Sequence, residues 1–149
     1  MSCVTFLGTG GGRMVVLNQM RKSGGFWLKL DDVNILHDPG PGSLVMAHQL
    51  GLRPRDLDAI ILSHRHIDHS NDVNVMTEAM TGGGFSPGGR LIVPSDCLDS
   101  DPVILQYVRP FVEINEIIGE PFYSPYHRLN GGTVECWQEL LVTPENFLV

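Results

Sequence analysis

The sequence predicts an α/β domain in which helices pack against a sheet that contains parallel strands. A strand is expected at residues 58–62, of which residues 59–62 are all apolar, as in a strand that is buried on both faces. An earlier strand and a helix precede this segment, and a strand–helix–strand order is typical of parallel sheets. The chain has 149 residues, 42% apolar and 18% charged, which is enough for one domain with a hydrophobic core.

The first strand is expected at residues 3–7, where β-branched and aromatic residues predominate. It ends in the glycine-rich turn 8–12, whose glycines allow positive φ and a close approach of the backbone. One interpretation is a phosphate cradle for a nucleotide. However, Arg13 stands where a GxGxxG motif has its third glycine, so a tight turn beside the functional site is favoured.

The next elements are a hairpin and a helix. Strands are expected at 25–30 and 33–37, joined by a two-residue turn. The Pro-Gly-Pro-Gly sequence at 39–42 interrupts regular structure. Ser43 is then expected to cap a helix over residues 44–50.

The second half of the chain is expected to add further helices and strands. Helices are predicted at residues 73–80 and 101–108, and strands are predicted at 90–94, 112–118 and 132–141. Ser70, Asn71 or Asp72 would cap the first of these helices. The glycine-rich segment 81–89 is expected near the pocket, as a substrate lid or as a plain connector.

Three histidines and an aspartate fall within six residues directly after the apolar strand. Because strand side chains alternate, His64, His66 and Asp68 are expected to point the same way as the strand ends. His69 would reach the same space from another angle. Imidazole and carboxylate groups on converging backbone are suitable ligands for a first-row metal ion.

The spacing favours two ions over one, because neighbouring side chains diverge and do not easily close one tetrahedron. His64 with His66, and Asp68 with His69, would each contribute to one ion. Two adjacent ions would then hold a bridging hydroxide that is nucleophilic at neutral pH. The alternative is a histidine-rich surface loop that binds no metal, which the regular spacing after a buried strand disfavours.

The HxHxDH motif at residues 64–69 resembles the signature of the metallo-β-lactamase superfamily. Residues 4–12 resemble the opening strand and turn of its RNase Z-like and phosphodiesterase-like branch. Residues 37–42 resemble the segment that carries the family's buried aspartate. The resemblance covers the first two thirds of the chain, and the HxHxDH motif is its most specific part.

The resemblance implies a metallo-β-lactamase-like αββα sandwich. Family members continue beyond this length with a second β-rich half, which supplies a further histidine, a bridging aspartate and a last histidine. Because the sequence stops at the apolar residues 147–149, we expect residues 1–149 to be a single, truncated domain holding the N-terminal half of the four-layer fold. His127 is an alternative later ligand, although its surroundings do not resemble the family's later histidine segment.

The function that the resemblance implies is a metal-dependent hydrolase that uses a metal-bound hydroxide, with phosphodiesters favoured and lactones, thioesters and β-lactams still open. Two zinc ions are expected, with manganese or iron as alternatives. Their ligands would be His64, His66, Asp68 and His69, and Asp68 would also act in catalysis by orienting the hydroxide. Asp38 would accept a hydrogen bond from a ligand histidine and fix its tautomer, or it simply caps a turn. The alternative function is a catalytically incomplete, metal-binding or self-assembling fragment.

Composition limits the partners. The net charge is −7 and no basic stripe is visible, which disfavours nucleic acid, although a bound metal would add local positive charge. A small molecule or a phosphodiester therefore remains the expected substrate. No apolar run of about 18 residues is present, so no membrane partner is expected.

The cysteines and the incomplete fold lead to two further expectations. Cys3, Cys97 and Cys136 are odd in number and far apart, which is typical of reduced thiols in a cytoplasmic protein. A half-fold would expose an apolar face and a sheet edge, so a homo-oligomer is expected.

Overall fold

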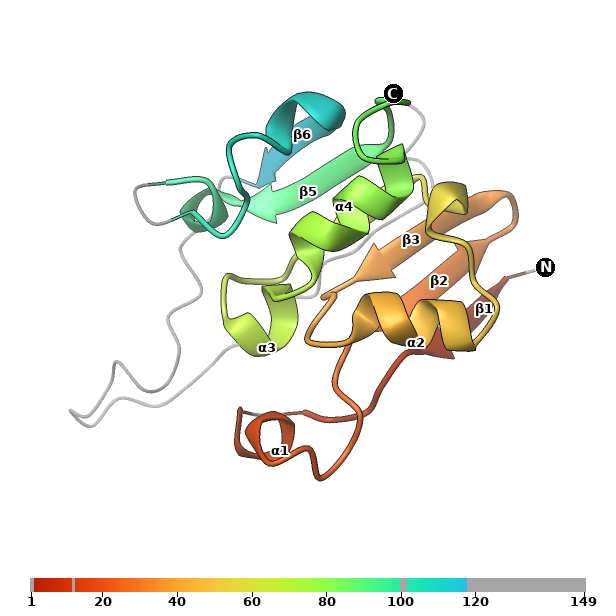
Figure 1. Cartoon of the computed structure of the whole chain (residues 1–149), viewed down its shortest axis with the longest axis vertical. Coiled ribbons are helices and arrows are strands. Elements are labelled where there is room, and N and C mark those ends of the chain that lie inside the picture. The colour runs from red at the N-terminus through yellow and green to blue at the C-terminus, as the bar shows by residue number, and fades with distance from the viewer. Residues whose placement is uncertain (1, 12, 100–101, 118–149) are drawn as a thin grey trace.

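The structure is a computed structural model that describes residues 2–11, 13–99 and 102–117. Within these ranges, six strands form one sheet in the order β1-β2-β3-β4-β5-β6 (Figure 1). The strands are β1 (Cys3–Phe6), β2 (Phe26–Leu30), β3 (Val33–His37), β4 (Ala59–Ile61), β5 (Arg90–Pro94) and β6 (Glu113–Ile117).

The sheet is antiparallel on one side and parallel on the other. The β1–β2 and β2–β3 pairs are antiparallel, whereas the β3–β4, β4–β5 and β5–β6 pairs are parallel. The hairpin between β2 and β3 turns at Asp31, whose φ of 51° is one that aspartate tolerates better than most residues. The predicted hairpin and the predicted parallel arrangement are both confirmed.

Helices cover one face of the sheet. The described helices are α1 (Arg13–Leu17), α2 (Ser43–Gln49), α3 (Ile67–Ser70) and α4 (Val73–Thr81), with short 3₁₀ turns at Pro54–Asp56, Ser95–Cys97 and Arg109–Phe111. Helix α2 connects β3 to β4, and α4 connects β4 to β5, and both lie on the same face (Figure 1). None of the helices in these ranges has the length and hydrophobicity that spanning a bilayer requires.

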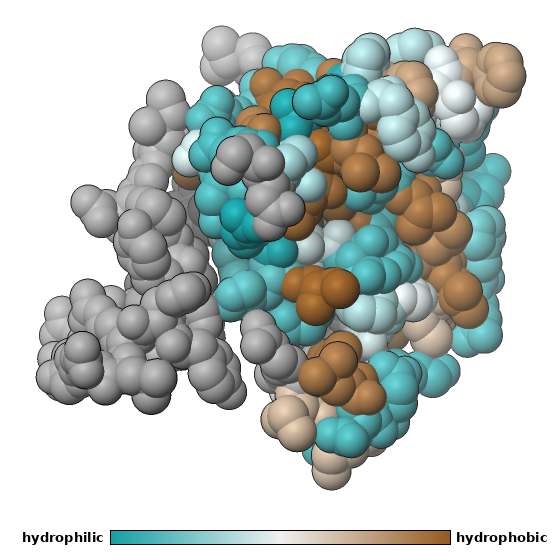
Figure 2. Space-filling view, turned by 60° about the vertical axis from the view of Figure 1, so that its left-hand side comes forward, coloured by the Kyte–Doolittle hydropathy of each residue, from teal (hydrophilic) through white to brown (hydrophobic). Residues whose placement is uncertain are grey.

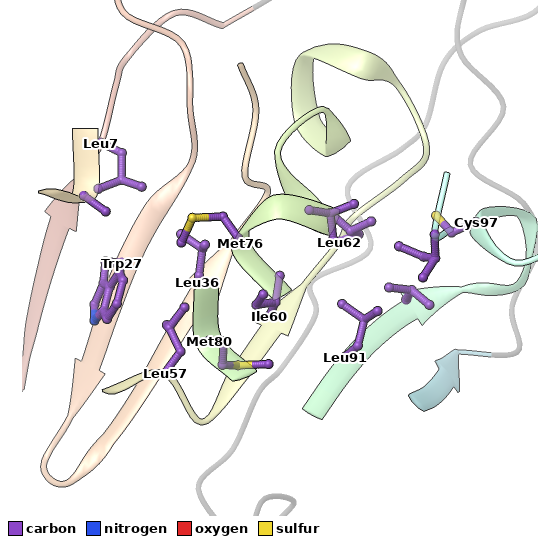
Figure 3. Packing of buried hydrophobic residues seen from close by; sticks show 14 residues of the cluster. Leu7, Trp27, Leu36, Leu57, Ile60, Leu62, Met76, Met80, Leu91 and Cys97 are labelled. Atoms are coloured by element: carbon purple, nitrogen blue, oxygen red, sulfur yellow. The ribbon is translucent and has the colours of Figure 1, made fainter. Parts of the chain in front are cut away.

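The main core lies between the sheet and these two helices (Figure 3). Trp27, Leu36 and Ile60 occupy positions that face the helices on neighbouring strands, and each is at most 3% exposed. Met76 and Met80 of α4 complete the contact from the other layer. Burial of apolar surface of this kind is the dominant favourable contribution to folding.

The opposite face of β3 and β4 is also buried. Ile35, Ala59 and Ile61 form a second apolar cluster, and each is at most 2% exposed. All three residues of β4 are therefore buried. This confirms the interpretation of the consecutive apolar positions as a strand buried on both faces.

Leu36→Ala should lower the free energy of unfolding by about 2–5 kcal/mol, because Leu36 is 0% exposed in a central strand and its truncation leaves a cavity. Urea unfolding followed by circular dichroism measures this. Val45→Ala on the outer face of α2 is the matched control, because Val45 is 59% exposed and its loss should change stability by about 0.5 kcal/mol or less. Equal effects of the two substitutions would contradict this placement of the core.

Two predicted helical features are wrong. Residues 102–108 form bends and turns instead of a helix. Side chains bind the backbone groups of this segment: Asn74 donates to Val103 O and accepts from Leu105 N, and the Arg109 guanidinium donates to Ile104 O. In α2 the N-cap is Gly42, with φ 87°, and the Ser43 hydroxyl donates to Gly40 O instead of capping the helix.

The glycine-rich segment between α4 and β5 does not lie near the candidate site, which corrects the expected location. The segment leads into the start of β5, at Arg90, whereas the HxHxDH motif follows the end of β4. Strands β4 and β5 are parallel, with Ala59 opposite Arg90. The segment therefore lies at the amino ends of these strands, and the HxHxDH motif lies at their carboxyl ends. This position disfavours a role as a substrate lid over the HxHxDH motif. The predicted strand at 132–141 and His127 lie outside the described residues.

Candidate metal centre

The HxHxDH motif begins where β4 ends and continues into a helix. Strand β4 stops at Ile61, and the expected alternation of strand side chains through Asp68 is wrong, because α3 begins at Ile67. The backbone N–H and the hydroxyl of Ser70 both donate to His66 O, which closes a helical turn. Asp68 and His69 therefore lie on this turn, while His64 and His66 precede it.

His64 and His66 face one another. His64 Nε2 lies 3.0 Å from His66 Nδ1, and the ring centroids are 4.6 Å apart with the planes nearly perpendicular. His64 is buried, with 8% of its surface exposed. At this separation one of the two ring nitrogens donates a hydrogen bond and the other accepts it, so both nitrogens are directed at the space between the rings.

Asp68 and His69 form the second pair. His69 Nε2 lies 3.6 Å from Asp68 Oδ2, and the Asp68 side chain is only 10% exposed. The centroid of the His69 ring is 4.2 Å from that of His64, so the two pairs are adjacent. The structure thus brings all four predicted side chains together at one end of β4. Their role as metal ligands stays a prediction.

Asp38 connects the site to the sheet. Its backbone N–H donates to Ile61 O, and its φ of 48° turns the chain away from β3. Its carboxylate accepts hydrogen bonds from the Ser63 backbone N–H at 2.7 Å and from the Ser63 hydroxyl at 2.6 Å. The nitrogen His69 Nδ1 lies 3.0 Å from Asp38 Oδ2. The predicted contact between Asp38 and a motif histidine is therefore present, and its importance for metal binding stays a prediction.

Two neighbours of Asp38 were not assigned to the candidate site from the sequence. The Ser63 hydroxyl contacts both Asp38 and His64 Nδ1. On a regular strand His37 would point away from Asp38, but His37 Nδ1 lies 3.4 Å from Asp38 Oδ2, because the left-handed conformation of Asp38 breaks the strand alternation. The His37 ring also stacks on Phe26, with centroids 4.8 Å apart. A serine directly after a buried strand and before a histidine was the available signal for Ser63.

The environment separates the pKa values of these groups. Burial disfavours the ionised carboxylate, but the hydrogen bond from His69, the nearby His37 and the hydrogen bonds from Ser63 hold the pKa of Asp38 below its ordinary value. Burial, together with His69 and His66, lowers the pKa of His64 to about 4. For His69 the contacts with Asp38 and Asp68 outweigh burial, so the pKa of His69 is raised. His64 is therefore neutral at neutral pH, the form in which imidazole binds metals.

The loop after Asp38 packs directly against α3. A Cβ atom on Gly40 would collide with Asp68 O, so only glycine fits there. The Asp72 N–H donates to Pro39 O at 2.8 Å, and the Asp72 carboxylate accepts from Leu44 N at 3.2 Å. These contacts fix the backbone that carries Asp38 relative to the backbone that carries Asp68.

The donor set fits metal ligation in pairs. Histidine nitrogens and a carboxylate oxygen are the usual ligands of zinc and of related ions, and a catalytic zinc ion normally has three protein ligands. Among the described residues, no three His, Cys, Asp or Glu side chains are arranged to hold one ion together. The described residues would therefore supply some, but not all, of the protein ligands that each of two ions needs.

Comparison with known proteins identifies the family. A family described as "Beta-lactamase superfamily domain" matches residues 33–130, which is more than half of the chain. The chain belongs to this superfamily. The resemblance to the metallo-β-lactamase superfamily is thereby confirmed, and its members generally bind metals.

Individual relatives agree with this assignment. The β-lactamase superfamily chain is 38% identical over 80 residues to an uncharacterised protein of Methanocaldococcus jannaschii, covering 54% of the chain and 30% of that protein. It is 36% identical over 64 residues to a protein named ribonuclease Z from Methanopyrus kandleri, covering 43% of the chain and 22% of that protein. The chain thus spans less than a third of the length of either relative.

A solved structure supports the fold. The metallo-β-lactamase fold protein YhfI from Bacillus subtilis superimposes with a TM-score of 0.57 at 24% identity, covering 78% of this chain and 46% of YhfI. The predicted α/β fold of the metallo-β-lactamase type is therefore confirmed. The match extends over about half of that fold, as expected from the resemblance.

Proposed function

We propose that this β-lactamase superfamily chain is part of a metal-dependent hydrolase that cleaves phosphodiesters. The observation that carries the proposal is the convergence of two donor pairs, His64 with His66 and Asp68 with His69, at the end of a buried strand. When bound, divalent ions such as zinc would supply Lewis acidity and a nucleophile at neutral pH. The similarity to ribonuclease Z over 64 residues favours a phosphodiester as substrate.

The protein's own residues have separate roles in this proposal. His64 and His66 hold one ion, and Asp68 and His69 hold the other. Asp68 also orients the attacking water, because its nearly buried carboxylate can accept hydrogen bonds. Asp38 keeps the Nδ1 proton of His69 engaged, so that Nε2 is directed at Asp68.

A second function has a specific observation in its favour. Because the described residues contain no group of three donors arranged around one point, the chain is alternatively a catalytically incomplete module that binds metal weakly. Figure 2 shows hydrophobic residues breaking the hydrophilic surface in several patches, and Val4 and Phe6 on the edge strand β1 are 50% and 63% exposed. Such surface favours self-association into a homo-oligomer. Sedimentation velocity of the intact chain measures this, and a monomer at all concentrations would contradict it.

Turnover of bis-p-nitrophenyl phosphate by the zinc-loaded chain tests the proposed hydrolase. His66→Ala should lower kcat/KM by about 100-fold or more, because it removes one nitrogen of the first donor pair. His48→Ala is the matched control, because His48 lies on the exposed face of α2 and should leave turnover unchanged. Equal turnover in wild type and His66→Ala would reject the assignment. Zinc binding without turnover in the wild type would instead favour the incomplete module.

A further inference from the structure

A chain of hydrogen bonds runs from Asp38 through Ser63 to His64. The Ser63 Oγ lies 2.6 Å from Asp38 Oδ2 and 2.9 Å from His64 Nδ1. At its far end, His64 Nε2 lies 3.0 Å from His66 Nδ1. All the links are short enough for strong hydrogen bonds.

The number of available protons determines the direction of this chain. A carboxylate is ionised at neutral pH and only accepts hydrogen bonds, so the single hydroxyl proton of Ser63 is donated to Asp38. The Ser63 oxygen then offers only lone pairs to His64. The proton between Ser63 and His64 must therefore be on His64 Nδ1.

We propose that Ser63 is a positioning residue that fixes His64 in the Nδ1–H tautomer and thereby leaves Nε2 with a lone pair for a metal ion. The metal-binding part of this inference rests on the proposed function, whereas the tautomer exists without metal. The same carboxylate receives His69 Nδ1 directly at 3.0 Å. One aspartate therefore orients one histidine from each donor pair, and the Ser63 hydroxyl extends its influence to His64.

When the Ser63 hydroxyl is removed, water can take its place as the hydrogen-bond partner of His64 Nδ1, because residue 63 lies at an exposed position. A water molecule at His64 Nδ1 both donates and accepts, so it imposes no single tautomer. In Ser63→Ala the proton is then free to move to His64 Nε2, where it is donated to His66 Nδ1. Ser63→Thr keeps the hydroxyl and should keep the wild-type tautomer.

Nitrogen NMR of the metal-free, ¹⁵N-histidine-labelled full chain tests the tautomer. The wild type should show His64 with a protonated Nδ1 and an unprotonated Nε2, with the signals assigned through loss of the peaks in His64→Gln. Ser63→Ala should give a mixture of the two tautomers, and Ser63→Thr should restore the single form. A protonated Nε2 in the wild type, or an unchanged tautomer in Ser63→Ala, overturns the inference.

Zinc titration against a competing chromophoric chelator tests the consequence for binding. Ser63→Ala should weaken zinc binding by about 10- to 100-fold, the usual effect of removing a group that orients a ligand. Ser63→Thr should bind like the wild type. Ser86→Ala is the matched control, because Ser86 is exposed at the opposite edge of the sheet.

The two measurements separate this inference from the proposed function. A changed tautomer with unchanged zinc affinity overturns the link between Ser63 and the metal. A wild type that binds no zinc removes the proposed function, and the NMR result still decides whether Ser63 sets the tautomer of His64.

Discussion

Gly25→Ala should lower the free energy of unfolding by about 4 kcal/mol or more, the range in which single substitutions are exceptional. A Cβ atom on Gly25 would collide with the backbone oxygens of His37 and Asp38. These atoms cannot move aside cheaply, because Phe26 pairs with His37 in the β2–β3 ladder. The Gly25 carbonyl also accepts the hydrogen bond from Leu7 N, so any shift disturbs β1 as well.

Gly11→Ala is the matched control for this substitution. A Cβ atom on Gly11 meets no heavy atom within 4 Å, so its effect should be about 0.5 kcal/mol or less. Urea unfolding of the two variants and the wild type, followed by circular dichroism, measures both effects. A Gly25→Ala protein as stable as Gly11→Ala would show that the two hairpin strands and the following loop do not approach as closely as described.

Asp38→Ala should lower the free energy of unfolding by about 3–5 kcal/mol. It removes a buried carboxylate that holds the Ser63 N–H, the Ser63 hydroxyl and His69 Nδ1, and loss of one partner leaves the others unsatisfied. It also places alanine at a φ of 48°, where a residue with an ordinary Cβ is strained by about 1–2 kcal/mol. Thermal and urea unfolding of the metal-free protein measure the loss.

Two controls divide this effect into its parts. Asp31→Ala places alanine at a comparable φ of 51° in an exposed turn, where the backbone strain should again be about 1–2 kcal/mol. Asp38→Asn keeps the shape and an acceptor for Ser63, so its loss should be smaller than that of Asp38→Ala. An Asp38→Ala loss no larger than that of Asp31→Ala would contradict the carboxylate's role.

The pH dependence follows from the direction of the Asp38 shift. Because the pKa of Asp38 is lower in the folded chain, its ionised form stabilises the fold above its unfolded pKa of about 4. That stabilisation is lost as the pH falls through the folded pKa. The stability difference between the wild type and Asp38→Asn should therefore shrink below about pH 4, and a constant difference down to pH 2 would contradict it.

The elements that the sequence predicted well are those whose local pattern and tertiary role agree. The hairpin strands β2 and β3 flank a two-residue turn, and β4 consists of three buried apolar residues, so turn signal, apolar pattern and burial indicate the same structure. The helices α2 and α4 were predicted to within two residues at each end, because their apolar spacing faces one core cluster.

The features that the sequence did not predict depend on contacts between distant segments. The predicted helix after residue 101 failed because Asn74, 29 residues away from Val103 along the chain, binds its backbone. The short helix α1 has no capping signal or apolar period and was missed. Ser43 was a good cap by residue type, but its hydroxyl is engaged by Gly40 O in the loop before it.

The candidate site shows the same division. The proximity of the four side chains was predictable from the motif, because four donors within six residues leave few arrangements. The strand alternation proposed for Asp68 was wrong, because Ser70 closes a helical turn on His66. The positions of Ser63 and His37 around Asp38 depend on its left-handed backbone, which no local pattern indicated.

The contact between the loop at Gly40 and helix α3 has a consequence for ligand capture. Because Gly40 abuts Asp68 O and the Asp72 N–H donates to Pro39 O, the two backbone segments are held against each other. Their conformational entropy is lost when the chain folds. An ion that arrives later would meet donors whose main chain is already ordered, so little of its binding energy would be spent on arranging the protein.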